Sequence, residues 1–464
     1  MGIKYLLSLL GAVTYSQPWM MAAIFAAFYL SLGVLAFSRP VAAMVMYFGT
    51  SIMNPQMNYP LFMSIPLAKT TAGLALLVCL LNAGKLVVRL PLSLLPVLAF
   101  LGMACVSAFA AVRPELADKR LEEFLKVGLM LFLTVWVVRS REDYDFLFWG
   151  ILGSLAFNIL KNLVETQTNG NWVAIRGTAG WITDSNDWGL AIAMALPFFY
   201  TALVLQWRRS VKWRIALGLA AAGALLALTM TSSRGAFLAA AVSGTIFVAM
   251  DRKPWRALAF AAALAGIAAI YMPGSYVSRV SSILGLEQTA TSAWAKDLDD
   301  EQEYTGAERV LYWRYAYEIM KDHPWAGVGW GNFIEEFKQR AGLKEGFVAH
   351  STWFQVGAEA GVVSLALYFL MLFAGIATAL AVWRQARQRA DTWAEYQARA
   401  LACGLIAFCV GATFLSRENS ELLFIFLGMS AILAFLAKTS PRPALPKGAL
   451  GHSRLNVSSS NALY

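Results

Sequence analysis

Apolar stretches recur along most of this 464-residue chain, and several of them run for about 20 residues. A stretch of that length crosses the hydrocarbon core of a bilayer as one α-helix. Of all residues, 58% are hydrophobic and 14% are charged, whereas an average soluble domain carries about 25% charged residues. One soluble globule of this size cannot bury so many apolar side chains. The sequence therefore predicts an all-α, polytopic membrane protein.

The apolar pattern predicts roughly 12 to 14 transmembrane helices, because residues 2–14 add one candidate and 41–53 is short for a crossing. The spans lie near residues 19–36, 41–53, 66–82, 91–110, 122–138, 144–164, 187–206, 213–230, 235–250, 257–272, 352–382, 400–415 and 420–437. The expected organisation is a transmembrane bundle over 1–272, a loop subdomain over 273–350, membrane helices over 351–437 and a disordered cytoplasmic tail over 438–464.

Positive charges predict how the chain is oriented in the membrane. Short basic connections stay in the cytoplasm, and alternate threading of the spans collects Arg208, Arg209, Lys212, Arg214, Arg252, Lys253, Arg256, Arg384, Arg387, Arg389, Lys438, Arg442 and Lys447 on one side. The connection 165–186, the turn Thr231–Gly235 and the loop 273–350 then lie outside. Against this bias, Arg113, Lys119 and Arg120 are also left outside. The net charge of +10 fits membrane orientation better than nucleic-acid binding, since no basic arm occurs.

The long polar loop 273–350 contains more aromatic residues than a disordered linker carries. Within it, residues 306–322 have helical character, and Pro324 disfavours helix in the residue before it. The glycines of 327–331 then predict a turn. We therefore expect a folded, partly helical structure on the membrane surface.

Histidines are scarce, and only His350 stands where the external loop enters a membrane helix. His323 lies at a predicted helix end, and His452 lies in the polar tail. A histidine at the position of His350 can act as a general base near neutral pH. The alternative is an interfacial residue beside the helix cap Ser351. Position alone leaves both interpretations open.

Arginines on the external side favour an anion-binding site. Arg234 lies in a tight turn with Ser233 between two apolar helices, where an arginine needs an anionic partner or has to extend toward the interface. Arg309 and Trp313 are four residues apart and share one helix face. Arg176, Asn186 and Arg279 are predicted on the same side of the membrane. With His350, these residues supply cations for a phosphate leaving group and one base.

Other chemistries are less well supported by the sequence. The motif Asp297-Leu-Asp-Asp300 lies in an acidic run without a neighbouring strand pattern, which is typical of a solvated charge run rather than a metal site. The glycines of 327–331 follow no strand and are spaced too closely for a dinucleotide fingerprint. Glu359, inside an apolar span, is either a proton relay or a buried polar partner for another helix. We therefore expect neither a metal nor a cofactor.

Four motifs occur in a characteristic order in the second half of the chain. They are Ser233-Arg-Gly-Ala236, Arg309-Val-Leu-Tyr-Trp313, His323-Pro-Trp-Ala-Gly-Val-Gly-Trp-Gly-Asn-Phe333, and Ala349-His-Ser-Thr-Trp-Phe-Gln355 followed by Glu359 and Gly361. Together they resemble the O-antigen ligase and polymerase superfamily. The last motif and Met53-Asn-Pro55 are most similar to the exosortase-associated O-glycosylation ligase branch. The resemblance covers residues 176–375 well and the first half mainly through its pattern of spans.

The resemblance implies a fold like that of C-type glycosyltransferases, with a long periplasmic loop. It also implies an enzyme of the bacterial inner membrane that takes a glycan from undecaprenyl diphosphate at the periplasmic face. By position, Arg234 and Arg309 match the arginines expected to hold the diphosphate, and His350 matches the base. Ser351 stands where many ligases have asparagine, so the acceptor, a lipid A core sugar or a protein hydroxyl, stays unassigned.

These observations predict a metal-independent, inverting glycan transfer. His350 deprotonates or orients the acceptor hydroxyl, while Arg234 and Arg309, assisted by Arg176 and Arg279, neutralise the departing diphosphate. The predicted supporting residues are Ser233, Trp313, Glu359 and Asn186. One alternative is a polymerase, for which the acceptor is a second lipid-linked repeat. Another is a transporter or flippase of lipid-linked sugars, in which polar residues should recur along several spans.

Overall fold

The structure is a computed structural model that describes residues 18–59, 62–169, 184–207, 209–256 and 306–439, with residues 258, 259, 262 and 266. Within these ranges every regular element is a helix. Six of the described helices are long and apolar enough to cross a membrane, and three further apolar helices are shorter. The predicted all-α, polytopic membrane fold is confirmed. The number of crossings stays a prediction, because residues 2–14 and most of 257–272 lie outside the described residues.

The N-terminal half packs around α3 and α8, which contact each other along their lengths. Its elements are α2 (Pro18–Ser38), α3 (Val41–Met53), α4 (Pro55–Asn58), α5 (Leu67–Leu81), η2 (Ala83–Lys85), η3 (Leu92–Leu94), α6 (Leu95–Phe109), α7 (Pro114–Val137) and α8 (Arg141–Asn169). Many side chains of α2 and α5 are apolar and exposed, as expected for helices that face lipid.

The C-terminal half packs around α17, which contacts α9, α11 and α16. Its elements are α9 (Ser185–Leu205), α10 (Val211–Met230), α11 (Arg234–Ala249), α14 (Gly306–Asp322), α15 (Phe333–Ala341), α16 (Thr352–Gln388), α17 (Thr392–Ala412) and α18 (Glu421–Thr439). Each apolar span predicted within the described residues coincides with a helix. The helices α7 and α17 begin well before their predicted spans, because hydropathy marks only the apolar part of a helix.

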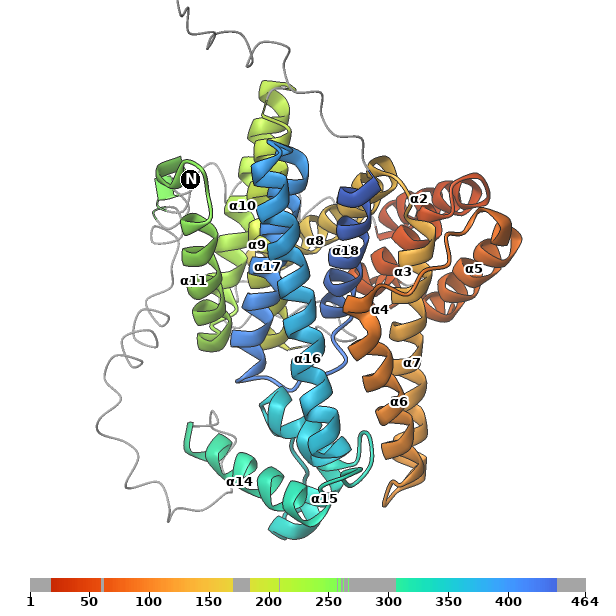
Figure 1. Cartoon of the computed structure of the whole chain (residues 1–464), viewed down its shortest axis with the longest axis vertical. Coiled ribbons are helices and arrows are strands. Elements are labelled where there is room, and N and C mark those ends of the chain that lie inside the picture. Colours follow the sequence, from red (N-terminus) through yellow and green to blue (C-terminus); the bar gives the residue numbers. More distant parts are fainter. Residues whose placement is uncertain are drawn as a thin grey trace, which may run out of the picture.

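The bundle has two opposite ends, which we call the basic face and the loop face. At the basic face, Arg252 pairs with Glu395, and Arg141 pairs with Asp391. Figure 1 shows α14 and α15 lying across the other end of the bundle, at the foot of α16, and this end is the loop face. The backbone N–H of Arg113 donates to Asn332 Oδ1 at 2.9 Å there. The basic residues at the start of α7 therefore lie on the loop face, as the threading predicted.

The helix α16 is broken at Gly361, whose φ of 82° and ψ of 176° are not helical. A break leaves backbone N–H and C=O groups without helical partners, which is costly in an apolar environment. The turn after α14 supplies these partners. Val328 and Gly329 donate their N–H groups to the carbonyls of Ala358 and Glu359, both at 3.0 Å, and Val362 N–H donates to Pro324 at 2.8 Å.

Gly327 is required in this turn for two reasons. Its φ is +67°, in the left-handed region that other residues adopt at a cost. In addition, a Cβ atom on Gly327 would lie 2.2 Å from the carbonyl carbon and oxygen of Glu359. The predicted glycine turn thus packs directly against the break in α16.

We expect Gly327→Ala to lower the thermal unfolding midpoint far more than Gly342→Ala. Gly342 also has a positive φ of +65°, but a Cβ there meets no atom within 4 Å. The control variant therefore carries only the backbone cost of about 1 kcal/mol, whereas Gly327→Ala also forces the turn off α16. Tryptophan fluorescence during heating of the detergent-purified variants measures both midpoints. Equal losses in the two variants would contradict the close-packing argument.

Candidate active site

Several chain segments with polar or charged side chains meet at the loop face. They are the start of α9, the turn before α11, the helix α14, the turn that carries His350, and the turn between α17 and α18. Each turn ends at the first residues of a helix, and the side chains of Asp184 and Ser233 cap α9 and α11. The sequence-predicted residues that the structure describes all lie in or beside these segments.

Arg234 is the first residue of α11 and its side chain is exposed. The preceding Ser233 is the N-cap, and its Oγ accepts a hydrogen bond from Ala236 N–H at 3.3 Å. Ser233 is 3% exposed, so it fixes the turn and does not face an outside ligand. The tight turn therefore presents the Arg234 guanidinium at the loop face.

Arg309 lies on α14 and is close enough to Arg234 for electrostatic repulsion. Burial, together with this neighbouring cation, lowers the pKa of the Arg309 guanidinium below its ordinary value. Two like charges in a partly buried place favour the binding of an anion between them. Asp184, the N-cap of α9, is the acidic group that opposes them from another element.

His350 is held in an unusual backbone conformation, with φ of +50°. The residue before it is fixed by Gln355, because Ala349 N–H donates to Gln355 Oε1 at 2.9 Å. The imidazole lies beside the ring of Tyr312, with a centroid distance of 5.8 Å. Since Tyr312 is on the same helix as Arg309, α14 brings its arginine near the histidine. The structure thus gathers Arg234, Arg309 and His350.

Glu359 is buried and connects Gln355 to the glycine turn. Its Oε1 accepts from Gln355 Nε2 at 2.6 Å, and its Oε2 accepts from Gly331 N–H at 2.9 Å. Of the two roles left open for Glu359, the contacts fit the buried polar partner. A chain of hydrogen bonds therefore runs from the glycine turn through α16 to the residue before His350.

The other predicted residues have different surroundings. The indole of Trp313 stacks on Phe354 with a centroid distance of 5.5 Å, so it packs α14 against α16. Asn186 uses its backbone N–H to donate to Asp184 Oδ1 at 2.6 Å in the first turn of α9. Arg176, Arg279 and the run Asp297–Glu303 lie outside the described residues. Within the described residues, no group of three or more His, Cys, Asp or Glu side chains is placed to hold a metal ion.

The sequence analysis missed Arg417, in the turn between α17 and α18. Its guanidinium forms two hydrogen bonds with the carboxylate of Asp187 on α9. Arg417 also interacts electrostatically with His350. A signal was present, because Ser416-Arg417 between two apolar spans repeats the pattern of Ser233-Arg234.

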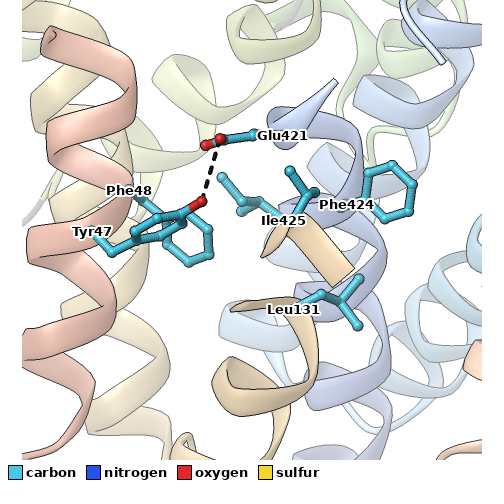
Figure 2. A pocket seen from close by; sticks show the side chains of 7 residues that line it. Tyr47, Phe48, Leu131, Glu421, Phe424 and Ile425 are labelled. Atoms are coloured by element: carbon cyan, nitrogen blue, oxygen red, sulfur yellow. Dashed lines mark hydrogen bonds between the residues drawn. The ribbon is translucent and has the colours of Figure 1, made fainter. Parts of the chain in front are cut away.

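A pocket between α3, α7 and α18 is a poor place for an anionic donor. Figure 2 shows Glu421 facing Tyr47 across it, and the Tyr47 hydroxyl donates to Glu421 Oε1 at 3.3 Å. The other lining residues are Phe48, Val127, Leu131, Phe424 and Ile425. The lining contains no cation, so this contact joins α3 to α18 and the arginine cluster remains the candidate site.

We expect His350 to titrate near pH 4 in the folded protein. Burial and the nearby cations Arg309 and Arg417 lower its pKa to about 4, and Asp184 opposes them. Because the cationic form is disfavoured, the imidazole is neutral at pH 6–8 and accepts a proton from solvent only as the pH falls toward 4. The chain has three histidines, so the NMR signal that is lost in His350→Ala identifies this residue.

Two variants on α14 test whether the neighbouring cation lowers the pKa of His350. Arg309→Ala should raise the pKa of His350, because a repelling cation is removed. Arg314→Ala should leave it unchanged, since Arg314 is exposed and pairs with Glu318 at 3.0 Å. A titration midpoint near 6.5 in the parent protein, the ordinary value for histidine, would contradict the burial of the imidazole.

Comparison with known families identifies two parts of the chain. Residues 219–369 match the family described as O-Antigen ligase. Residues 20–173 match a family of unknown function. No curated protein matches the chain. The first match covers Arg234, Arg309 and His350, the three residues that the fold brings together. Residues 219–369 of this polytopic membrane protein are therefore similar to the O-Antigen ligase family.

Proposed function

We propose that this protein is a glycosyltransferase that transfers a glycan from undecaprenyl diphosphate to an acceptor hydroxyl. The observation that carries the proposal is the cluster of Arg234, Arg309 and His350 at one face of a membrane bundle. The match to the O-Antigen ligase family over residues 219–369 supports it. We further propose that the loop face is the periplasmic side of a bacterial inner membrane, because the opposite end carries the basic short connections.

The proposed reaction is a direct displacement at the anomeric carbon. The acceptor oxygen forms a bond to this carbon as the bond to the diphosphate oxygen breaks, so the configuration inverts. The neutral imidazole of His350 takes the acceptor proton. Arg234 and Arg309 donate hydrogen bonds to the diphosphate as its charge increases, and preformed cations of this kind stabilise a leaving group without a metal ion.

The remaining residues take supporting roles in this proposal. Ser233 shapes the turn of Arg234, Glu359 holds the glycine turn, and Trp313 fixes α14 against α16. Asn186 belongs to the first turn of α9. Arg176 and Arg279, which lie outside the described residues, are proposed to assist in binding the diphosphate.

We expect base and anion-binding variants to fail in different ways. His350→Ala should lose turnover by on the order of 10² to 10⁴-fold while undecaprenyl diphosphate still binds. Arg234→Ala and Arg309→Ala should weaken donor binding as well as turnover, and lysine should rescue only in part because it lacks the planar fork. Donor affinity and single-turnover rates in one detergent separate the two classes.

Two controls accompany these variants. His323→Ala removes a histidine whose described hydrogen bonds are made by its backbone, and Arg314→Ala removes an exposed charge from the helix of Arg309. Both should keep parental binding and turnover. If His350→Ala retains near-normal turnover, or both arginine variants bind donor like the parent, these roles are wrong.

The acceptor class is proposed as a lipid A core sugar or a protein hydroxyl. The sequence resemblance to the exosortase-associated branch favours a ligase, whereas a polymerase would use a second lipid-linked repeat. We expect deletion of the gene to abolish attachment of surface glycan and to leave its chain length normal, as measured by gel electrophoresis of surface glycans. Single repeats on the acceptor would instead indicate the polymerase. Flippase activity would require polar residues along several spans, whereas the described charged cluster lies at one face.

A further inference from the structure

Arg417 is a candidate for a further role because its ion pair with Asp187 leaves one edge of its guanidinium open. The Asp187 side chain is 3% exposed and that of Arg417 is 25% exposed. Nε and Nη2 of Arg417 donate to the two carboxylate oxygens of Asp187. For Nη1, the described part of the chain provides no acceptor within hydrogen-bond distance. The side-on pair therefore fixes the guanidinium and keeps Nη1 free.

The turn of Arg417 is tied to the turn of His350 at two points on α16. Arg417 N–H donates to Thr352 Oγ1 at 3.0 Å, and Thr352 Oγ1 donates to the carbonyl of Leu415 at 2.6 Å. The hydroxyl of Ser416 donates to Gln355 Oε1 at 3.1 Å. The same Gln355 oxygen accepts the N–H that precedes His350. Because both turns share these anchors, Arg417 keeps a fixed position relative to His350.

The charges around Arg417 include both carboxylates and cations. Arg417 interacts electrostatically with Asp187, Glu418 and Asp184, and also with His350. Asp184 also interacts with Arg309, which in turn lies near Arg234. Within the described residues, Asp187 is in direct contact with Arg417, and no ion pair joins Arg234 or Arg309 to a carboxylate. A diphosphate, which carries more than one negative charge, complements this arrangement.

We propose that Arg417, held by Asp187, is a third arginine of the diphosphate-binding site. Its free Nη1 edge would donate to an oxygen of the leaving group. Because Asp187 holds the guanidinium in place, binding requires little loss of side-chain freedom. This inference rests on the proposed function, since it assigns a further residue to the same donor site.

A purely structural role for Arg417 makes a different prediction. In that case the ion pair only joins α9 to the turn before α18, and Arg417 contributes nothing once Asp187 is neutralised. Arg417→Ala alone is a poor test, because it leaves a buried aspartate without its partner and can unfold the protein. We therefore compare Asp187→Asn with the double variant Asp187→Asn/Arg417→Gln. This comparison removes Arg417 without leaving a buried unpaired carboxylate.

The measurement is binding of undecaprenyl diphosphate to the full-length protein in detergent, followed by tryptophan fluorescence. We expect the double variant to bind about ten- to a hundredfold more weakly than Asp187→Asn, the range for loss of a hydrogen bond to a charged group. Arg417→Lys, which keeps the charge and the contact with Asp187, should bind about tenfold more weakly than the parent. Arg314→Ala is the control for loss of a loop-face charge and should bind like the parent.

Two results separate failure of this inference from failure of the proposed function. If the parent binds undecaprenyl diphosphate and the double variant binds it as Asp187→Asn does, Arg417 is structural and the inference is wrong. If the parent binds only inorganic diphosphate, and Arg417→Lys and the double variant weaken that binding, the anion site stands and the lipid-linked donor is wrong. If the parent binds neither probe, both proposals fail.

Discussion

The break in α16 is the constraint on which the loop face depends. A continuous helix through Gly361 would satisfy its own backbone and leave no partners for the turn that follows α14. Because the helix stops there, the carbonyls of Ala358 and Glu359 accept from that turn, and Pro324 accepts from Val362 N–H. These hydrogen bonds are strong where water is scarce. They attach the turn after α14 to the membrane bundle at the break in α16.

The same hydrogen-bond network sets the geometry of the candidate site. Gln355 and Glu359 lie on the short helical segment before the break, and they connect the glycine turn to the residue that precedes His350. The segment also anchors the turn of Arg417 through Thr352. A single element therefore positions His350 and Arg417, which are far apart in sequence. Supporting shells of this kind are what hold reactive groups in place.

The arginine cluster places like charges close together at one face of the membrane bundle. Arg234 and Arg309 repel each other, and burial adds to the cost of the Arg309 charge. Arg417 avoids this cost through its pair with Asp187. The site therefore contains arginines of two kinds, two that lack a direct carboxylate contact within the described residues and one already compensated. An anion that binds between them gains most from the first kind.

The sequence by itself determined the helical membrane fold, the helix 306–322 and the glycine turn, and it predicted His350, Arg234 and Arg309 as candidate site residues. These features follow from local properties, since hydropathy, proline and glycine act within a few residues of their own position. The sequence predicted Glu359 as a supporting residue and placed Gln355 in a motif, but it indicated the partner of neither, and Arg417 was missed. Their roles were decided by the tertiary structure, because the partners Gly331, Ala349 and Asp187 are brought to them by packing between distant helices.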